Sequence, residues 1–149
     1  YFNAHDMYFI GRNVDYAASL EASLKLKEIS YIHSEAYTAG ELKHGPISLL
    51  EDGTLVIAIA TYEKLFDKMM SNVREVKARG AVVLGITVRG REEALKQETD
   101  YQFCVPDITD FMLPSLSILP LQLFAYYVAS MKGCDIDKPR NLAKSVTVE

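Results

Sequence analysis

Two continuous apolar runs, TLVIAIA at residues 54–60 and AVVLGITV at residues 81–88, decide the fold because they enclose a stretch of helical spacing. Runs of apolar, largely β-branched residues without polar alternation are typical of parallel strands buried on both faces. Between them, residues 62–79 place apolar side chains at helical intervals, and Gly80 ends that helix. A strand, a helix and a second strand of this kind predict a parallel βαβ unit.

The alternation of strands and helices continues on both sides of this unit. Further strands are predicted at residues 7–11 (MYFIG), 34–37 and 101–105. Further helices are predicted at residues 14–32, 91–98 and 114–131, the last kinked at Pro120, with helical turns at residues 41–50 broken by Gly45-Pro46. Repeated βα units favour a parallel sheet with helices on both faces. The predicted fold class is therefore α/β, a three-layer sandwich with a five-stranded parallel sheet flanked by helices.

The composition is that of one globular domain without a basic surface. A chain of 149 residues with 49% apolar content can bury a full core. The net charge of −4, with basic residues scattered among acidic ones, gives no basic stripe, so no nucleic-acid partner is expected. No apolar run reaches about 18 residues, so no membrane association is expected. Tyr1 in place of an initiator Met indicates a piece cut from a longer chain.

Neither a metal nor a nucleotide cofactor is predicted. The two cysteines, Cys104 and Cys134, lack metal-ligand spacing, and we expect reduced thiols in a cytoplasmic protein. The chain contains no GxGxxG or Walker sequence. Ligands of such sheets bind where strands end and helices begin. The loops at residues 11–13 and 60–62 lack the glycine-rich or hydroxyl-rich run that cradles a phosphate.

The helix predicted at residues 14–32, VDYAASLEASLKLKEISYI, carries charges between two apolar arcs. One arc holds Ala17, Leu20, Leu24 and Tyr31, the other holds Ala18, Ala22, Leu26 and Ile29, and Glu21, Lys25 and Glu28 lie between them. The opposite face, with Ser19, Ser23, Lys27 and Ser30, is the predicted solvent side. We therefore expect the three charged residues to point toward the body of the protein, near a cleft at the carboxyl edge of the sheet.

Two interpretations of these charges remain open on the pattern alone. Glu21, Lys25 and Glu28 have the i,i+4 and i,i+3 spacing of an ion-pair ladder, in which each pair contributes about 0.2–0.5 kcal/mol. Charges aimed inward can instead line a cleft in which they take part in chemistry. His44 by itself is typical of a loop histidine, His5 and His33 are interpreted as structural, and Lys144 lies in what resembles a solvated terminus.

Three longer motifs carry a family resemblance. They are LKLKEISYIH at residues 24–33, GELKHGP at residues 40–46 and PRNLAKSVTVE at residues 139–149. With them, residues 8–149 resemble the C-terminal part of the glucosamine-6-phosphate synthases, the glutamine:fructose-6-phosphate amidotransferases. The resemblance implies a single flavodoxin-like SIS (sugar isomerase) domain over residues 1–149, the second of the two in that family.

The resemblance implies a reaction and a set of site residues. Fructose 6-phosphate and glutamine would be converted to glucosamine 6-phosphate and glutamate, with Glu28 as the isomerising base that moves a proton between sugar carbons. Lys144 would form a Schiff base with the open-chain ketose. His44 would open the sugar ring and be contributed across a subunit interface, while Glu21, Lys25 and Ala143 would line the sugar-phosphate pocket.

The resemblance also implies what lies outside this chain. The glutaminase domain, which begins with a nucleophilic cysteine, and the first SIS domain are not in the sequence. The implied assembly is a cytoplasmic homodimer with a sugar phosphate as ligand. The alternatives are a non-catalytic SIS module that binds sugar phosphates, and a purely structural oligomerisation domain.

Overall fold

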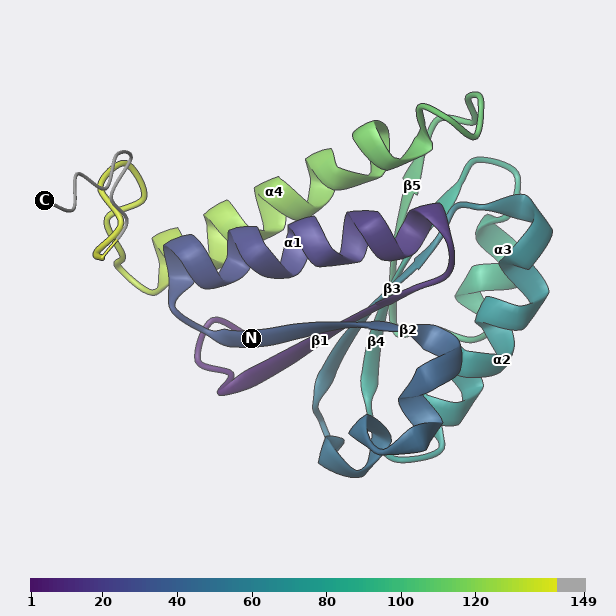
Figure 1. Ribbon diagram of the computed structural model, residues 1–149, viewed down its shortest axis with the longest axis horizontal. Coiled ribbons are helices and arrows are strands. Elements are labelled where there is room, and N and C mark those ends of the chain that lie inside the picture. Colours follow the sequence, from purple (N-terminus) through teal and green to yellow (C-terminus); the bar gives the residue numbers. More distant parts are fainter. Residues whose placement is uncertain (142–149) are drawn as a thin grey trace, which may run out of the picture.

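The computed structural model describes residues 1–141, and its centre is a five-stranded sheet with all strands parallel (Figure 1). The strands are β1 (Asp6–Gly11), β2 (His33–Thr38), β3 (Leu55–Ala60), β4 (Val82–Val88) and β5 (Tyr101–Val105). Their order across the sheet is β2-β1-β3-β4-β5. Every residue of β3 is buried, as its continuous apolar sequence predicted. The predicted fold class is confirmed.

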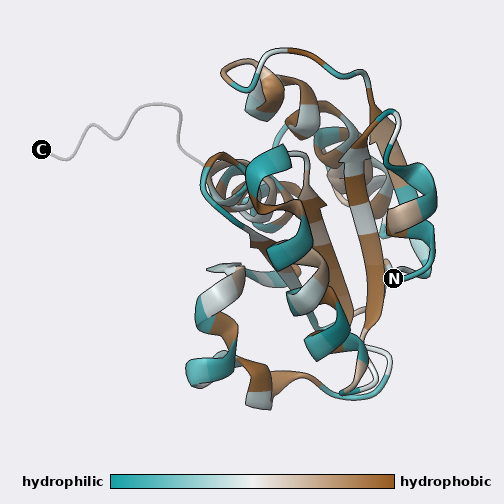
Figure 2. Cartoon of the chain, turned by 90° about the vertical axis from the view of Figure 1, so that its right-hand side faces the viewer, coloured by the Kyte–Doolittle hydropathy of each residue, from teal (hydrophilic) through white to brown (hydrophobic). Residues whose placement is uncertain are grey.

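Helices cover both faces of the sheet (Figure 1). The α-helices are α1 (Val14–Ser30), α2 (Phe66–Lys77), α3 (Glu92–Lys96) and α4 (Leu113–Met131), and the 3-10 helices are η1 (Ala39–His44), η2 (Pro46–Leu49) and η3 (Glu63–Leu65). Figure 1 shows α1 and α4 side by side on one face and α2 and α3 on the other. Figure 2 shows the apolar strands enclosed between these layers. The long helix α4 continues through Pro120.

The core is divided by the sheet into two clusters. Met7 and Phe9 of β1 pack against α1 and α4, whereas Tyr8 and Ile10 of the same strand pack against α2. This division follows from the two-residue period of a strand, which sends alternate side chains to opposite faces. Among residues 1–141, one helix, α4, is long enough and apolar enough to cross a membrane. Helices in the core of soluble proteins also meet these two criteria.

The predicted solvent face of α1 is wrong for its three serines, while Lys27 is exposed as expected. Ser19, Ser23 and Ser30 are buried against the protein, while Leu20 and Leu24 are 47% and 43% exposed. Two of the serine hydroxyls donate to carbonyls one turn back within α1, from Ser19 Oγ to the oxygen of Asp15 at 2.9 Å and from Ser30 Oγ to that of Leu26 at 2.6 Å. The third, Ser23 Oγ, lies 3.0 Å from Ser34 Oγ on β2.

The physical reason for this orientation is that a small side chain with a satisfied hydroxyl packs as well as an alanine. A serine that bonds to the i−4 carbonyl presents no unpaired polar group to the core. The buried serines of α1 therefore approach the sheet together with Ala18, Ala22 and Leu26, while Leu20 and Leu24 turn outward.

Candidate functional site at the outer face of α1

The carboxyl ends of β1 and β3 form the point where such sheets usually bind ligands. After β1 the chain continues to β2 on one side, and β3 lies on the other side of β1, so the order of the sheet reverses between these strands. At this point Gly11 allows the first turn of α1 to pack onto the end of β1. A Cβ at Gly11 would lie 2.5 Å from the carbonyl carbon and oxygen of Asp15.

The side chain of Asp15 fills this point. It is 2% exposed, and its Oδ2 accepts hydrogen bonds from the backbone N–H groups of Thr61 at 2.9 Å and Tyr62 at 3.0 Å. Its Oδ1 accepts a bond from the Thr61 hydroxyl. Burial raises the pKa of Asp15 to about 6, although these hydrogen bonds and the charge of Arg91 favour the ionised form. The two N–H groups that could bind a phosphate oxygen therefore already bind a carboxylate.

Two arginines fill the rest of this edge. Arg12 Nε donates to Oδ1 of the buried Asn72 on α2 at 2.9 Å, and a Cβ at Gly40 would lie 2.9 Å from Arg12 Nη2. Arg91 lies over the Phe66 ring, 5.5 Å from its centroid, with its Nη2 3.4 Å from a carboxylate oxygen of Glu63. Both arginines thus contact neighbouring side chains at this edge, while Nη1 of Arg91 is buried without a hydrogen-bond partner among the described residues.

The charged residues of α1 form an ion-pair ladder on its outer face. Lys25 Nζ lies 2.7 Å from Glu28 Oε2 and 3.6 Å from Glu21 Oε1, and its pKa is raised, first by the hydrogen bond to Glu28. The side chains of Glu21, Lys25 and Glu28 are 46%, 35% and 24% exposed. The expectation that these charges point into the body of the protein is wrong, because the serine face occupies that side.

The ladder also lies at the other edge of the sheet from the one predicted. Glu28 is in the last turn of α1, which leads into the start of β2, and β2 is parallel to β1. The C-terminal end of α1 is therefore at the amino edge. Glu28 therefore does not lie near a cleft at the carboxyl edge, where the sequence had predicted it. At the amino edge, the structure places the partly covered carboxylate of Glu28, which is held by the ammonium group of Lys25.

The remaining predicted site residues lie elsewhere. His44 is exposed at the end of η1, whose Leu42 packs in the cluster with α2, so His44 belongs to the face of the sheet opposite α1. The described chain therefore does not bring His44 and Glu28 together. Ala143 and Lys144 lie outside the described residues.

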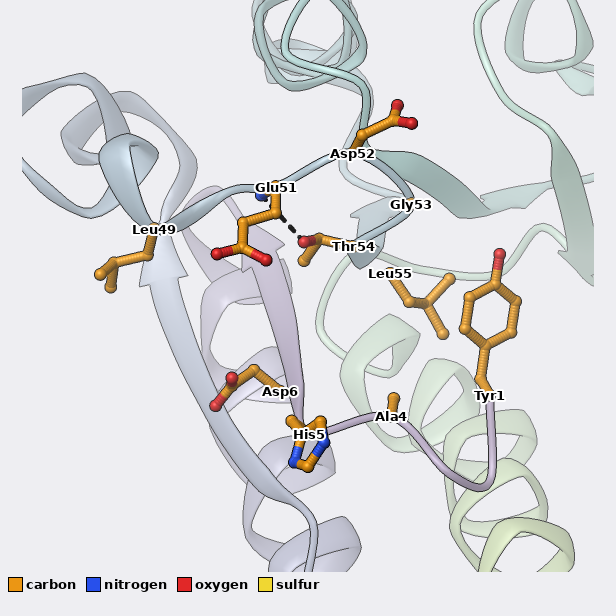
Figure 3. A pocket seen from close by; sticks show the side chains of 10 residues that line it. All are labelled: Tyr1, Ala4, His5, Asp6, Leu49, Glu51, Asp52, Gly53, Thr54 and Leu55. Carbon is orange, nitrogen blue, oxygen red and sulfur yellow. Dashed lines mark hydrogen bonds between the residues drawn. The ribbon is translucent and has the colours of Figure 1, made fainter.

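Two surface pockets have the wrong chemistry for a sugar phosphate. The first is at the amino edge between the start of β1 and the turn before β3, and Figure 3 shows the carboxylates of Asp6 and Glu51 on one side of it, with that of Asp52 turned away. Such a set of carboxylates repels a phosphate. The second is an apolar groove lined by Ile86, Phe103 and Leu121 between the sheet and α4. Within residues 1–141, no group of three or more His, Cys, Asp or Glu residues could hold a metal ion, and both cysteines are free.

Comparison with known proteins places the chain in a family. The model of the SIS domain matches residues 1–132. The chain belongs to the SIS domain family. The structure resembles the C-terminal domain of glucosamine-fructose-6-phosphate aminotransferase from Francisella tularensis with a TM-score of 0.88 and 38% identity, over 92% of this chain and 38% of that one. It also resembles glucosamine-6-phosphate deaminase from Thermotoga maritima, with a TM-score of 0.75 and 30% identity over 95% of this chain and 40% of that one.

Two sequence relatives of this SIS domain have the same name. The glutamine–fructose-6-phosphate aminotransferase [isomerizing] of Clostridium acetobutylicum is 58% identical over 97% of this chain and 24% of the relative. The protein of the same name from Caldanaerobacter subterraneus is 57% identical over 100% of this chain and 24% of the relative. The chain thus spans about 24% of the length of these relatives.

Sequence reasoning missed the residues that organise the carboxyl edge. Asp15 is on α1, Arg12 is in the loop before α1, and Asn72 is on α2, while the Asp15–Thr61 pair is separated by 46 residues. An acidic residue in the first turn of a helix is ordinarily explained by the helix dipole, so Asp15 gave no separate signal. Only the closeness of the ends of β1 and β3 gives it partners.

Proposed function

We propose that this SIS domain is the C-terminal isomerase domain of a glutamine–fructose-6-phosphate aminotransferase, which converts fructose 6-phosphate and glutamine to glucosamine 6-phosphate and glutamate. The observation that carries the proposal is the 57–59% identity, over nearly the whole chain, to relatives of that name. In the proposed protein a glutaminase domain and a first SIS domain complete the polypeptide. The proposed assembly is a cytoplasmic homodimer.

In the proposed mechanism Glu28 is the base that moves a proton between the first two carbons of the sugar. Lys25 supports this role, because its ammonium group lies 2.7 Å from Glu28 Oε2 and fixes the direction of the carboxylate. Lys144 condenses with the ketose carbonyl, losing water and forming an imine. Ammonia released from glutamine adds to this imine and displaces the Lys144 amine, which leaves the sugar imine on which Glu28 moves the proton. Glu21, Lys25 and Ala143 line the sugar pocket.

The proposed role of His44, opening the sugar ring, needs a second subunit. His44 and Glu28 are on opposite faces of the sheet, so one described chain cannot supply both to one sugar. A symmetric dimer allows each subunit to present His44 to the Glu28 of its partner.

The structure of the carboxyl edge supports assigning phosphate recognition to the rest of the protein. Because Asp15 occupies the N–H groups of Thr61 and Tyr62, this edge has no free cradle for a phosphate at that point. A non-catalytic module that senses sugar phosphates would need such a cradle. This observation favours the enzyme over the sensor.

The test uses full-length protein that carries this chain, with glucosamine 6-phosphate and free glutamate measured separately. Glu28→Gln and Lys144→Ala are expected to abolish sugar formation while glutamine hydrolysis persists, because a distant glutaminase cleaves glutamine. Glu93→Gln and Lys96→Ala, both exposed on α3, serve as matched controls and are expected to keep both activities. Retained sugar formation in either site variant would remove that residue from the mechanism.

A further inference from the structure

His44 lies at the end of a helix that is too short to be stable alone. The 3-10 helix η1 has six residues, and helices of this length form only where other parts of a protein hold them. Ala39 and Leu42 are buried in the cluster with α2, while His44 itself is exposed. After His44 the chain turns at Gly45, which has φ 148°. The direction of the imidazole therefore depends on what fixes η1.

The guanidinium group of Arg12 lies against the first turn of η1. A Cβ at Gly40 would lie 2.9 Å from Arg12 Nη2 and 3.4 Å from both Cζ and Nη1, so the flat face of the group covers this glycine. Any larger residue at position 40 would push the arginine and the helix apart. The contact between Arg12 and Gly40 therefore sets how closely η1 approaches the loop before α1.

A chain of hydrogen bonds fixes the direction of Arg12. Its Nε donates to Oδ1 of Asn72 on α2 at 2.9 Å, and Nδ2 of Asn72 donates to Oε2 of Glu75 at 3.1 Å. Asn72 is 4% exposed, so its amide is enclosed by the protein. The carbonyl oxygen of Arg12 accepts a bond from the N–H of Asp15 at 3.1 Å, in the first turn of α1. Arg12 thus joins α1, α2 and η1.

We propose that Arg12 is a positioning residue that aims His44 by holding the start of η1. The inference rests on the proposed function, in which His44 opens the ring of fructose 6-phosphate in the site of the partner subunit. Ring opening breaks the bond between C2 and the ring oxygen and moves one proton from the C2 hydroxyl to that oxygen, so the imidazole must be aimed at these atoms. A misplacement of about 1 Å can cost about 100-fold in rate.

The first test uses single variants of full-length protein that carries this chain. Arg12→Ala removes the guanidinium group, and Gly40→Ala displaces it from the other side of the contact. We expect each to lower kcat for sugar formation about tenfold or more, with KM for fructose 6-phosphate within about twofold and glutamine hydrolysis at the parent's rate. Arg89→Ala, which removes an exposed arginine after β4, is the matched control and is expected to match the parent.

A double variant tests whether the two residues act through one contact. In Arg12→Ala the further change Gly40→Ala should lower kcat no more, because the new methyl group meets no guanidinium group. Losses that add in the double variant would contradict the proposed contact.

Mixed dimers show through which residue Arg12 acts. In the proposed dimer each site combines Glu28 of one subunit with His44 of the other. A dimer of one Arg12→Ala subunit and one Glu28→Gln subunit therefore keeps one complete site, made by Glu28 of the first and His44 of the second. We expect this dimer, purified through two different tags, to regain about half the parent's rate of sugar formation, because one of its two sites is intact. The dimer of His44→Ala with Glu28→Gln is the reference and is expected to reach the same rate.

The outcomes separate this inference from the proposed function. If the reference dimer stays inactive, His44 does not act in the partner's site, and both are overturned. If the reference dimer recovers and the Arg12→Ala dimer does not, Arg12 acts within its own subunit and the inference alone is overturned. An unchanged kcat in Arg12→Ala would have the same consequence. Should Arg12→Ala fail to fold, the mixed dimer of Gly40→Ala with Glu28→Gln decides.

Discussion

Replacing Asp15 by asparagine is expected to change the pH dependence of stability while keeping the local hydrogen bonds. Asp15 Oδ2 accepts both backbone N–H bonds, from Thr61 and Tyr62, whereas Oδ1 meets only the Thr61 hydroxyl. An asparagine can place its oxygen at the first position and its NH2 at the second, because a hydroxyl accepts as well as donates. Asp15→Asn therefore removes the buried charge while keeping an acceptor for the backbone N–H groups of Thr61 and Tyr62.

The magnitude follows from the pKa. The pKa of Asp15 is raised from 3.8 to about 6 in the folded chain, so between these values the folded state binds more protons than the unfolded state. The free energy of unfolding therefore falls as pH rises through this window, by about 3 kcal/mol in total for this group. In Asp15→Asn, no group at this position ionises, so the free energy of unfolding does not fall for this reason. Between pH 4 and pH 7.5, the stability of Asp15→Asn is expected to rise by about 2 kcal/mol relative to that of the parent.

Urea unfolding of both proteins across this pH range measures the difference, because other titrating groups cancel when the two curves are subtracted. Asp110→Asn, which is exposed, is the matched control and is expected to follow the parent. A difference between Asp15→Asn and the parent that stays constant with pH would refute the reasoning, since it would mean that the buried carboxylate does not titrate in this window.

Three other predictions follow from the same geometry. Gly11→Ala is expected to destabilise the chain by about 1–3 kcal/mol in urea unfolding, because the added Cβ would lie 2.5 Å from backbone atoms of Asp15 that cannot move independently. The isolated 149-residue chain is expected to bind fructose 6-phosphate weakly and show little or no turnover, because Asp15 already occupies the N–H groups of Thr61 and Tyr62. Micromolar affinity by calorimetry would contradict this. Full-length protein is expected to sediment as a dimer, and a monomer at micromolar concentration would remove His44 from the site of a partner subunit.

The strands were predictable because their signal is local. Every residue of β3 is buried, and such a strand is apolar whatever its neighbours are.

The orientation of α1 was not predictable in this way. A helical wheel treats Ser19, Ser23 and Ser30 as polar, but whether a serine can be buried depends on the acceptor that its hydroxyl finds. In α1 the acceptors for Ser19 and Ser30 are carbonyls of the helix itself.

In the candidate site, too, only the contacts between residues close in the sequence could be predicted. Glu21, Lys25 and Glu28 form the ladder that their i,i+3 and i,i+4 spacing allows. Asp15 and the Arg12–Asn72 contact could not be predicted, since each joins segments 46 to 60 residues apart. A pairing of this kind depends on which strand ends and helix ends the topology places together.

The exposure of Glu28 bears on how a site at this face could react. A carboxylate that removes a proton from carbon is more effective when water is excluded, because water stabilises the charge that the reaction must consume. The Glu28 side chain is 24% exposed on the outer face of α1, next to the 43% exposed Leu24. A surface on which an exposed leucine lies beside a partly exposed carboxylate is one that another domain or subunit would cover. We therefore expect Glu28 to act only where the remaining polypeptide covers this face of α1.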